Sequence, residues 1–180
     1  QTQLDVQDQE THPAGHALAL QTALQQRSCP GPIHIRFLMK IVVTGATGFL
    51  GGRLLEQLTQ EGPADAELIG VGRTLKPGNI VDHERVRYEL GDLENVSFVN
   101  EVLRGADKVV HAAALSSQMG PPGAFERANV MATQHVVDAC LAHGVQRLVL
   151  ISSPSVYFQM KDQPNIQESD PLPNPINVYA

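Results

Sequence analysis

Three glycines at intervals of three residues form the motif in this sequence that most clearly suggests ligand binding. Gly45, Gly48 and Gly51 lie within the segment 44–51, directly after an apolar β-branched run at 41–43 and before apolar residues at helical spacing. A strand, a glycine turn and a helix in this order can hold a pyrophosphate, because the backbone approaches it closely and the helix N-terminus offers free N–H groups. The spacing predicts a nucleotide-binding turn, with an ordinary strand-to-helix turn as the alternative.

The residues after the second predicted strand bear on which dinucleotide fits. A site of this kind often has an acidic residue about 20 positions after the glycines, where it binds the adenosine ribose hydroxyls. This chain has Gly72 and Arg73 there, with Lys76 close by. Because an arginine can pair with a 2′-phosphate that a carboxylate would repel, the sequence favours NADP(H) over NAD(H). The alternative is that Arg73 is a solvated loop residue.

Further residues near the ends of the predicted strands could contact a cofactor. Asp92 could accept a hydrogen bond from an adenine amino group, or be an unspecialised turn aspartate. The small residues Ala112, Ala113 and Ala114 would let the backbone lie flat against a cofactor, or pack under a helix. Asn129, inside a predicted helix, suits either a structural hydrogen bond or a water relay.

Hydroxyl groups near the C-terminal end could take part in proton transfer. Ser152 and Ser153 close the fifth predicted strand, and Tyr179 lies near the end of the sequence. A serine can hydrogen-bond a substrate carbonyl or hydroxyl, and a tyrosine can pass the proton that accompanies hydride transfer. The free pKa of tyrosine, about 10, requires a nearby cation for this work at neutral pH. Spacing alone does not establish this pair.

The elements that would position these residues alternate regularly from Met39 onward. A polar loop around 77–79 takes the place of a full second helix. The alternation predicts an α/β fold, a Rossmann-type doubly wound parallel sheet in three α/β/α layers, whose ligands bind outside the carboxyl ends of the strands. Strands are predicted over 40–44, 67–71, 85–90, 108–111 and 147–152, and helices over 48–60, 96–103 and 124–142, the last closed by Gly144.

Composition limits the possible partners and locations. The chain has 180 residues, a net charge of −6 and no basic stripe with interleaved aromatics, which argues against a nucleic-acid partner. No apolar run approaches the roughly 18 residues that span a membrane. The two cysteines, Cys29 and Cys140, lie far apart and suit a reducing cytoplasm. No metal site is expected.

Residues 1–38 differ in composition from the rest and are predicted to be a disordered extension. They are rich in glutamine, and breakers such as Pro13 and Gly15 separate His12 from His16, which favours a solvated tail over a metal site. Met39 directly precedes the first strand and is expected to be the natural start, with upstream sequence before it. Mild proteolysis should remove this segment without loss of folding.

Six separated motifs in order resemble an extended short-chain dehydrogenase/reductase. More narrowly, they are similar to the NAD(P)-dependent epimerase/dehydratase group with its 3β-hydroxysteroid dehydrogenase-like relatives. The resemblance covers about 39–180. The motifs are T-G-A-T-G-F-L-G at 44–51, G-D-L at 91–93, H-A-A-A at 111–114, Asn129 in the long helix, S-S-P-S-V-Y at 152–157 and N-V-Y-A at 177–180.

The resemblance implies roles for individual residues. Ser153 would be the catalytic serine and Tyr179 the catalytic tyrosine. The glycine turn would hold the pyrophosphate, Asp92 and Leu93 would lie near adenine, and the three alanines would line the cofactor. The predicted cofactor-binding residues are Gly45, Thr47, Gly48, Phe49, Leu50, Gly51, Arg73, Asp92, Leu93, Ala112, Ala113, Ala114, Asn129 and Ser152.

The sequence departs from the family pattern at its end. The family's Tyr-x-x-x-Lys motif places a lysine beyond Ala180, where this sequence stops. That lysine lowers the pKa of the tyrosine and holds the nicotinamide ribose, and the substrate-binding C-terminal region would also be missing. The 180-residue chain is therefore expected to be inactive or nearly so, and measurable NADPH-dependent turnover would contradict this. Relatives often form homodimers through two helices, of which 124–142 would be one.

The resemblance leaves three classes of function open. The leading expectation is an oxidoreductase that moves hydride between NADP(H) and a carbonyl or secondary alcohol of a small-molecule substrate, as 3β-hydroxysteroid dehydrogenase-like enzymes do. The second is a sugar-nucleotide epimerase or dehydratase that works on tightly held NAD. The third is a non-catalytic NADP(H)-binding regulator. Fold and cofactor site do not identify the substrate.

Overall fold

The element order follows the predicted alternation of strands and helices. The computed structural model describes residues 39–117 and 119–179. The predicted disordered extension over 1–38 lies outside the described residues, and so do His12, His16 and Cys29.

Five parallel strands form one sheet in the order β3-β2-β1-β4-β5. They are β1 (Met39–Thr44), β2 (Ala66–Gly72), β3 (Val86–Leu90), β4 (Lys108–His111) and β5 (Arg147–Leu150). β1 lies between β2 and β4 and pairs in parallel with both. This order confirms the predicted doubly wound sheet. It places the topological switch point, where ligands bind in such sheets, at the carboxyl ends of β1 and β4.

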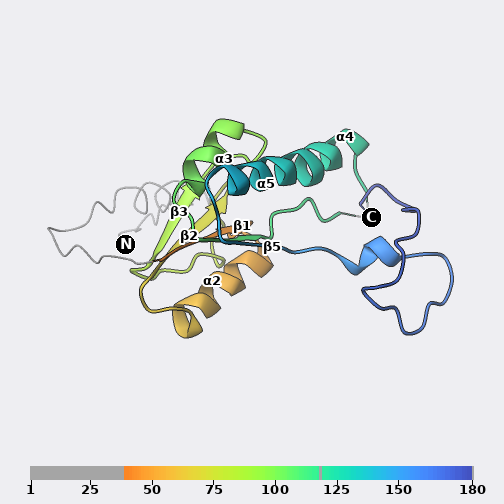
Figure 1. The fold of residues 1–180 in the computed structure, drawn as a ribbon, viewed down its shortest axis with the longest axis horizontal. Coiled ribbons are helices and arrows are strands. Elements are labelled where there is room, and N and C mark those ends of the chain that lie inside the picture. Colours follow the sequence, from red (N-terminus) through yellow and green to blue (C-terminus); the bar gives the residue numbers. More distant parts are fainter. Residues whose placement is uncertain (1–38, 118, 180) are drawn as a thin grey trace, which may run out of the picture.

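Helices cover both faces of the sheet (Figure 1). α2 (Phe49–Glu61) lies on one face. α3 (Val96–Leu103) lies on the other, together with a continuous helical segment of α4 (Pro122–Phe125), η1 (Glu126–Met131) and α5 (Ala132–Ala142). α3 begins where predicted because the Asn95 side chain accepts hydrogen bonds from the N–H groups of Ser97 and Phe98 at its first turn.

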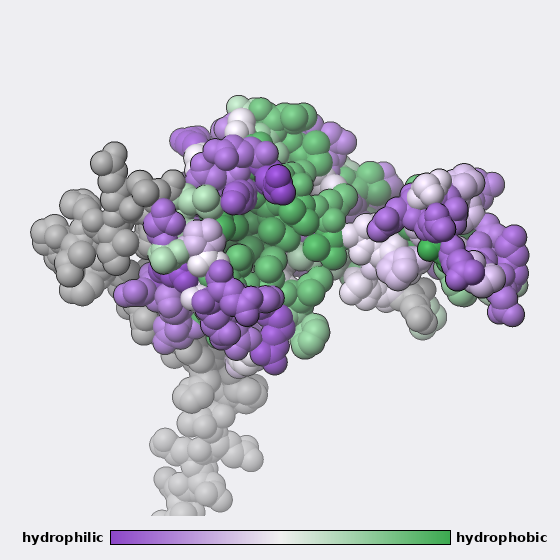
Figure 2. Space-filling view, turned by 60° about the horizontal axis from the view of Figure 1, so that its bottom comes forward, coloured by the Kyte–Doolittle hydropathy of each residue, from purple (hydrophilic) through white to green (hydrophobic). Residues whose placement is uncertain are grey.

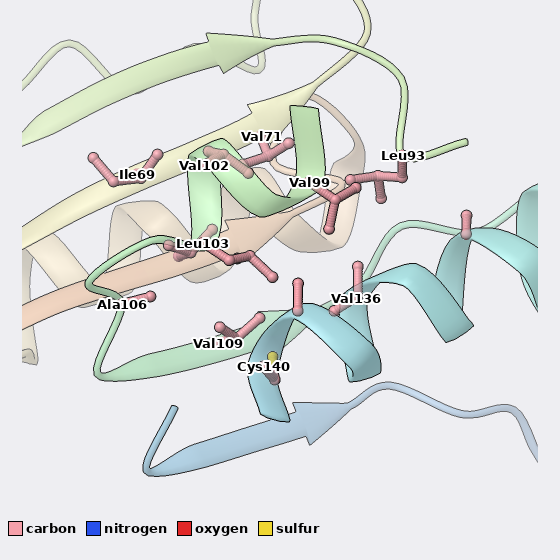
Figure 3. Packing of buried hydrophobic residues seen from close by; sticks show 13 residues of the cluster. Ile69, Val71, Leu93, Val99, Val102, Leu103, Ala106, Val109, Val136 and Cys140 are labelled. Carbon is pink, nitrogen blue, oxygen red and sulfur yellow. The ribbon is translucent and has the colours of Figure 1, made fainter. Parts of the chain in front are cut away.

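Two hydrophobic clusters attach these helices to the sheet. Alternation along β1 sends Val42 to one cluster and Ile41 and Val43 to the other. Figure 3 shows the larger cluster, where side chains of the strands meet those of α3 and α5. Its labelled members are Ile69, Val71, Leu93, Val99, Val102, Leu103, Ala106, Val109, Val136 and Cys140.

The α2 side of the sheet carries exposed apolar residues. Val149 of β5 pairs with Val110 and is exposed, as is Ile151, which follows β5. Figure 2, with this side turned toward the viewer, shows hydrophobic residues gathered over a broad area. In the described part of the chain, no helix is long and apolar enough to cross a membrane.

The fifth strand is shorter than predicted. It ends at Leu150, although the Ile151 N–H still donates to the His111 carbonyl at 3.0 Å. Ser152 and Ser153 leave the sheet and lead into the short helix η2 (Pro154–Tyr157). Pro154 explains this difference, because proline has no N–H for a ladder and starts a helical turn readily.

The long predicted helix is interrupted by a π-helical stretch. Residues Glu126–Met131 form η1 between α4 and α5, and the Ala132 N–H donates to the Arg127 carbonyl, five residues earlier. Apolar spacing predicts the helix but not this wider turn; Phe125, Ala132 and Val136 of the predicted face are buried. The predicted end at Gly144 is confirmed, because this residue has φ +66° directly after the helix.

Candidate functional site

The glycine turn lies directly against the chain that follows β4. Gly45 has φ +69°, and its carbonyl accepts a hydrogen bond from the Gly48 N–H at 2.9 Å. A Cβ at Gly45 would lie 2.7 Å from the Ala113 nitrogen and 2.8 Å from the Ala112 carbonyl carbon. Glycine is therefore required here by both backbone conformation and space.

The start of α2 has the features of an anion site. A Cβ at Gly51 would overlap the Gly45 carbonyl, so the helix packs closely on the turn. Gly48 is the N-cap residue and provides no side-chain cap, and no acidic residue lies in the first turn. The side chains of Phe49 and Leu50 are 78% and 51% exposed. Uncapped N–H groups and the positive end of the helix dipole fit a dinucleotide pyrophosphate.

A buried histidine links the ends of β1 and β4, which sequence reasoning did not identify as part of the site. His111 is 2% exposed, and its Nδ1 lies 2.6 Å from the Thr44 hydroxyl. Its Nε2 lies 3.0 Å from the Thr133 hydroxyl, on α5. The signal in the sequence was the alternation in β4, which places Val109 and His111 on the buried face.

The neighbouring hydrogen bonds favour one tautomer of this histidine, and its burial sets its charge state. The Thr44 hydroxyl accepts a hydrogen bond from the Ala113 N–H at 3.3 Å, which leaves its own proton to donate to His111 Nδ1. His111 Nε2 then carries the ring proton and donates to the Thr133 hydroxyl. Burial lowers the pKa of His111 to about 4, so the ring is neutral at neutral pH.

Asn129 holds the segment after the three alanines against the helix. Its Oδ1 accepts from the Leu115 N–H at 2.7 Å, and its Nδ2 donates to the Leu115 carbonyl at 3.2 Å. Asn129 lies in η1, so the widened turn and the paired hydrogen bonds occur together. This geometry matches the structural hydrogen bond that the sequence left open.

The predicted adenine-side residues lie between β3 and α3. Asp92 is exposed, and its Oδ1 accepts from the Glu94 N–H at 2.9 Å. Leu93 is buried in the larger cluster, and its carbonyl accepts a hydrogen bond from His135 Nδ1 at 2.9 Å.

Arg73, the residue expected to bind a 2′-phosphate, follows β2. It is exposed and makes no hydrogen bond or ion pair with the residues that the structure describes. Asp92, Leu93 and Arg73 each follow the carboxyl end of a strand.

The predicted catalytic hydroxyls lie beyond the sheet. Half-buried Ser153 caps η2: its Oγ accepts from the Ser155 N–H at 3.2 Å and donates to Ser155 Oγ at 3.0 Å. Ser152 is exposed, and the Tyr179 N–H donates to the Asn177 side chain at 2.9 Å. Within the described residues, no hydrogen bond joins Ser153 to Tyr179. The structure thus brings together the glycine turn, His111 and the alanine backbone, but not this pair. No group of three or more His, Cys, Asp or Glu residues able to hold a metal occurs in 39–117 or 119–179.

Comparison with known proteins identifies similar chains. Residues 41–180 match the NAD dependent epimerase/dehydratase family. The chain is 37% identical to a dTDP-glucose 4,6-dehydratase of Streptomyces antibioticus, over 66% of this chain and 38% of that protein. It is 36% identical to a 2-alkyl-3-oxoalkanoate reductase of Stenotrophomonas maltophilia, over 66% of this chain and 34% of that protein. The chain therefore spans less than half the length of these curated relatives.

A similar solved structure is a dTDP-glucose 4,6-dehydratase from Streptomyces venezuelae with NAD and TYD bound. It aligns with a TM-score of 0.72 and 32% identity, over 78% of this chain and 47% of that one.

Proposed function

The chain belongs to the NAD dependent epimerase/dehydratase family, and on that premise we propose that residues 39–180 are the dinucleotide-binding part of an NAD(P)-dependent oxidoreductase. The reaction is hydride transfer between NADP(H) and a carbonyl or secondary alcohol, of the 3β-hydroxysteroid dehydrogenase-like kind. The observation that carries the proposal is the Gly45 turn, which leaves no room for a Cβ beside the Ala113 backbone and lies next to the uncapped start of α2. This cradle fits a pyrophosphate and an extended cofactor.

In this proposal the chain's residues divide into binding and proton-transfer groups. The glycine turn, with the N–H groups of Phe49 and Leu50, binds the pyrophosphate, and Asp92 and Leu93 contact the adenine. When bound, the nicotinamide supplies or accepts the hydride. Ser153 orients the substrate oxygen, and Tyr179 gives or takes its proton. The hydrogen bonds that now hold Ser153 to Ser155 would have to be exchanged for one to substrate.

Arg73 provides the argument for NADP(H) over NAD(H). Its guanidinium is exposed at the end of β2 and is not engaged by another described residue, so it is available to a 2′-phosphate. Replacing Arg73 with Asp should weaken NADPH binding by about tenfold more than NADH binding, because an attraction becomes a repulsion. Fluorescence titration of both reduced cofactors measures this ratio. Equal loss of both would contradict the preference, and Lys76→Asp provides a neighbouring charge-reversal control.

A sugar-nucleotide epimerase or dehydratase is the second candidate, favoured by the similarity to dTDP-glucose 4,6-dehydratases. The two functions differ in what happens to the cofactor. A reductase consumes NADPH as product forms, whereas an epimerase or dehydratase returns its NAD to the starting state in each cycle. Turnover assays that follow both product and the absorbance of reduced nicotinamide separate them. Product formed without net change in the cofactor would overturn the oxidoreductase proposal.

A further inference from the structure

The end of β2 has no room for a side chain. Gly72 is its last residue, and a Cβ there would lie 2.5 Å from both Oγ1 and Cγ2 of Thr47 and 3.0 Å from its Cβ. Real Cβ atoms essentially never come this close to another atom. The side chain of Thr47, from the glycine turn, therefore fills the space in which a residue-72 side chain would begin.

The hydroxyl of Thr47 is poorly satisfied for a residue so enclosed. Thr47 is 8% exposed, and its hydroxyl makes no hydrogen bond to any described residue. Only its backbone carbonyl is used, accepting from Asn79 Nδ2 at 3.1 Å. The fully buried side-chain polar atoms without a partner, within the described residues, comprise His143 Nε2 alone, so Thr47 Oγ1 keeps an opening to the surface. A nearly buried hydroxyl with an opening and no partner suits a ligand.

The position of this hydroxyl indicates which part of a bound dinucleotide it would contact. In dinucleotide sites, the acidic residue at the end of the second strand binds the adenosine ribose hydroxyls. Here that position is Gly72, and Thr47 occupies its side-chain space. We propose that the Thr47 hydroxyl replaces the acidic residue as the adenosine-ribose contact and, with Gly72, sets the tolerance for a 2′-phosphate. This inference rests on the proposed dinucleotide-binding function.

The chemistry of a threonine differs from that of a carboxylate at this point. A hydroxyl both donates and accepts, so Thr47 can pair with a ribose hydroxyl or donate to a phosphate oxygen. An ionised carboxylate only accepts and repels a phosphate. With Thr47 and Gly72 in place of an acid, no carboxylate at position 72 repels a 2′-phosphate that pairs with the exposed Arg73 next along the chain.

Isosteric substitution at Thr47 tests the hydrogen bond. Thr47→Val keeps the packing beside Gly72 and removes only the hydroxyl, whereas Thr47→Ser keeps the hydroxyl. Affinities of the 180-residue chain for NADH and NADPH, measured by fluorescence titration, should fall about fivefold in Thr47→Val and stay within about twofold in Thr47→Ser. Unchanged affinity in Thr47→Val would overturn this assignment alone. If the unsubstituted chain bound neither cofactor, the proposed function would fail as well.

Exchange of the two side chains tests the specificity. Gly72→Asp alone should lower the melting temperature, because its Cβ would collide with Thr47, and adding Thr47→Gly should restore most of that loss. The double variant should bind NADH about tenfold more tightly relative to NADPH than the unsubstituted chain does. No thermal rescue, or rescue with an unchanged ratio of the two affinities, would overturn the proposal. The melting temperatures are measured without cofactor, so they test the packing of residues 47 and 72 independently of cofactor binding.

Discussion

Gly45→Ala is expected to destabilise the fold by about 3 kcal/mol and to weaken dinucleotide binding by about a hundredfold. An alanine at φ +69° costs about 1 kcal/mol, and collision of its Cβ with the backbone of Ala112 and Ala113 adds the rest. Either the turn or the segment after β4 must move. A displacement of about 1 Å in a functional site can cost about a hundredfold. Chemical denaturation and cofactor titration measure the two effects.

Gly105 offers a closely matched control for this substitution. It has the same φ of +69°, but a Cβ there would meet nothing within 4 Å. Gly105→Ala should therefore show only the conformational cost, about 1 kcal/mol, and should leave cofactor affinity unchanged. Equal destabilisation by the two substitutions would contradict the argument that Gly45 is required by the close approach of Ala113.

Acidification from about pH 6.5 to about pH 4 is expected to remove about 3 kcal/mol of stability through His111. Burial lowers the pKa of His111 from 6.5 to about 4 in the folded state. Between these values the unfolded chain binds a proton that the folded chain does not, so stability falls as pH falls. Each pKa unit corresponds to about 1.4 kcal/mol. Denaturation curves across this range, with the His111 ring followed by NMR, measure the effect.

A His111→Gln variant isolates this contribution from that of the carboxylates, which also titrate on acidification. The glutamine keeps polar groups near the Thr44 and Thr133 hydroxyls but does not ionise in this range. Its stability should start lower at neutral pH and depend less steeply on pH between 6.5 and 4. A slope as steep as that of the parent chain would show that His111 is not the group responsible.

The sequence predicted the sheet well because its signals are local. β4 over 108–111 and α3 over 96–103 occur where expected, since alternation marks the buried strand and Asn95 caps the helix. The glycine turn could also be anticipated, because its spacing reports a backbone requirement. Such features depend on residues that are neighbours along the chain.

The parts that were missed depend on contacts between distant segments. His111 bonds to Thr44 and Thr133, which lie 67 and 22 positions away in sequence. The space shared by Thr47 and Gly72 exists only because β2 ends beside the turn that follows β1. Predicting the His111 hydrogen bonds or the contact between Thr47 and Gly72 requires the pairing of the strands and the positions of their side chains. A pattern of residue types does not provide these.

The π-helical stretch makes the orientation of side chains along this helix depend on the exact number of residues in it. An α-helix advances by about 100° per residue, so one residue more or less rotates everything downstream by that angle. With η1 in place, Asn129 reaches Leu115 while Ala132, Val136 and Ala139 still face the core. Deleting a residue there would leave composition and hydrophobicity almost unchanged, yet it would turn one of these faces away. We therefore expect this helix to tolerate substitutions at its exposed positions better than the insertion or deletion of one residue.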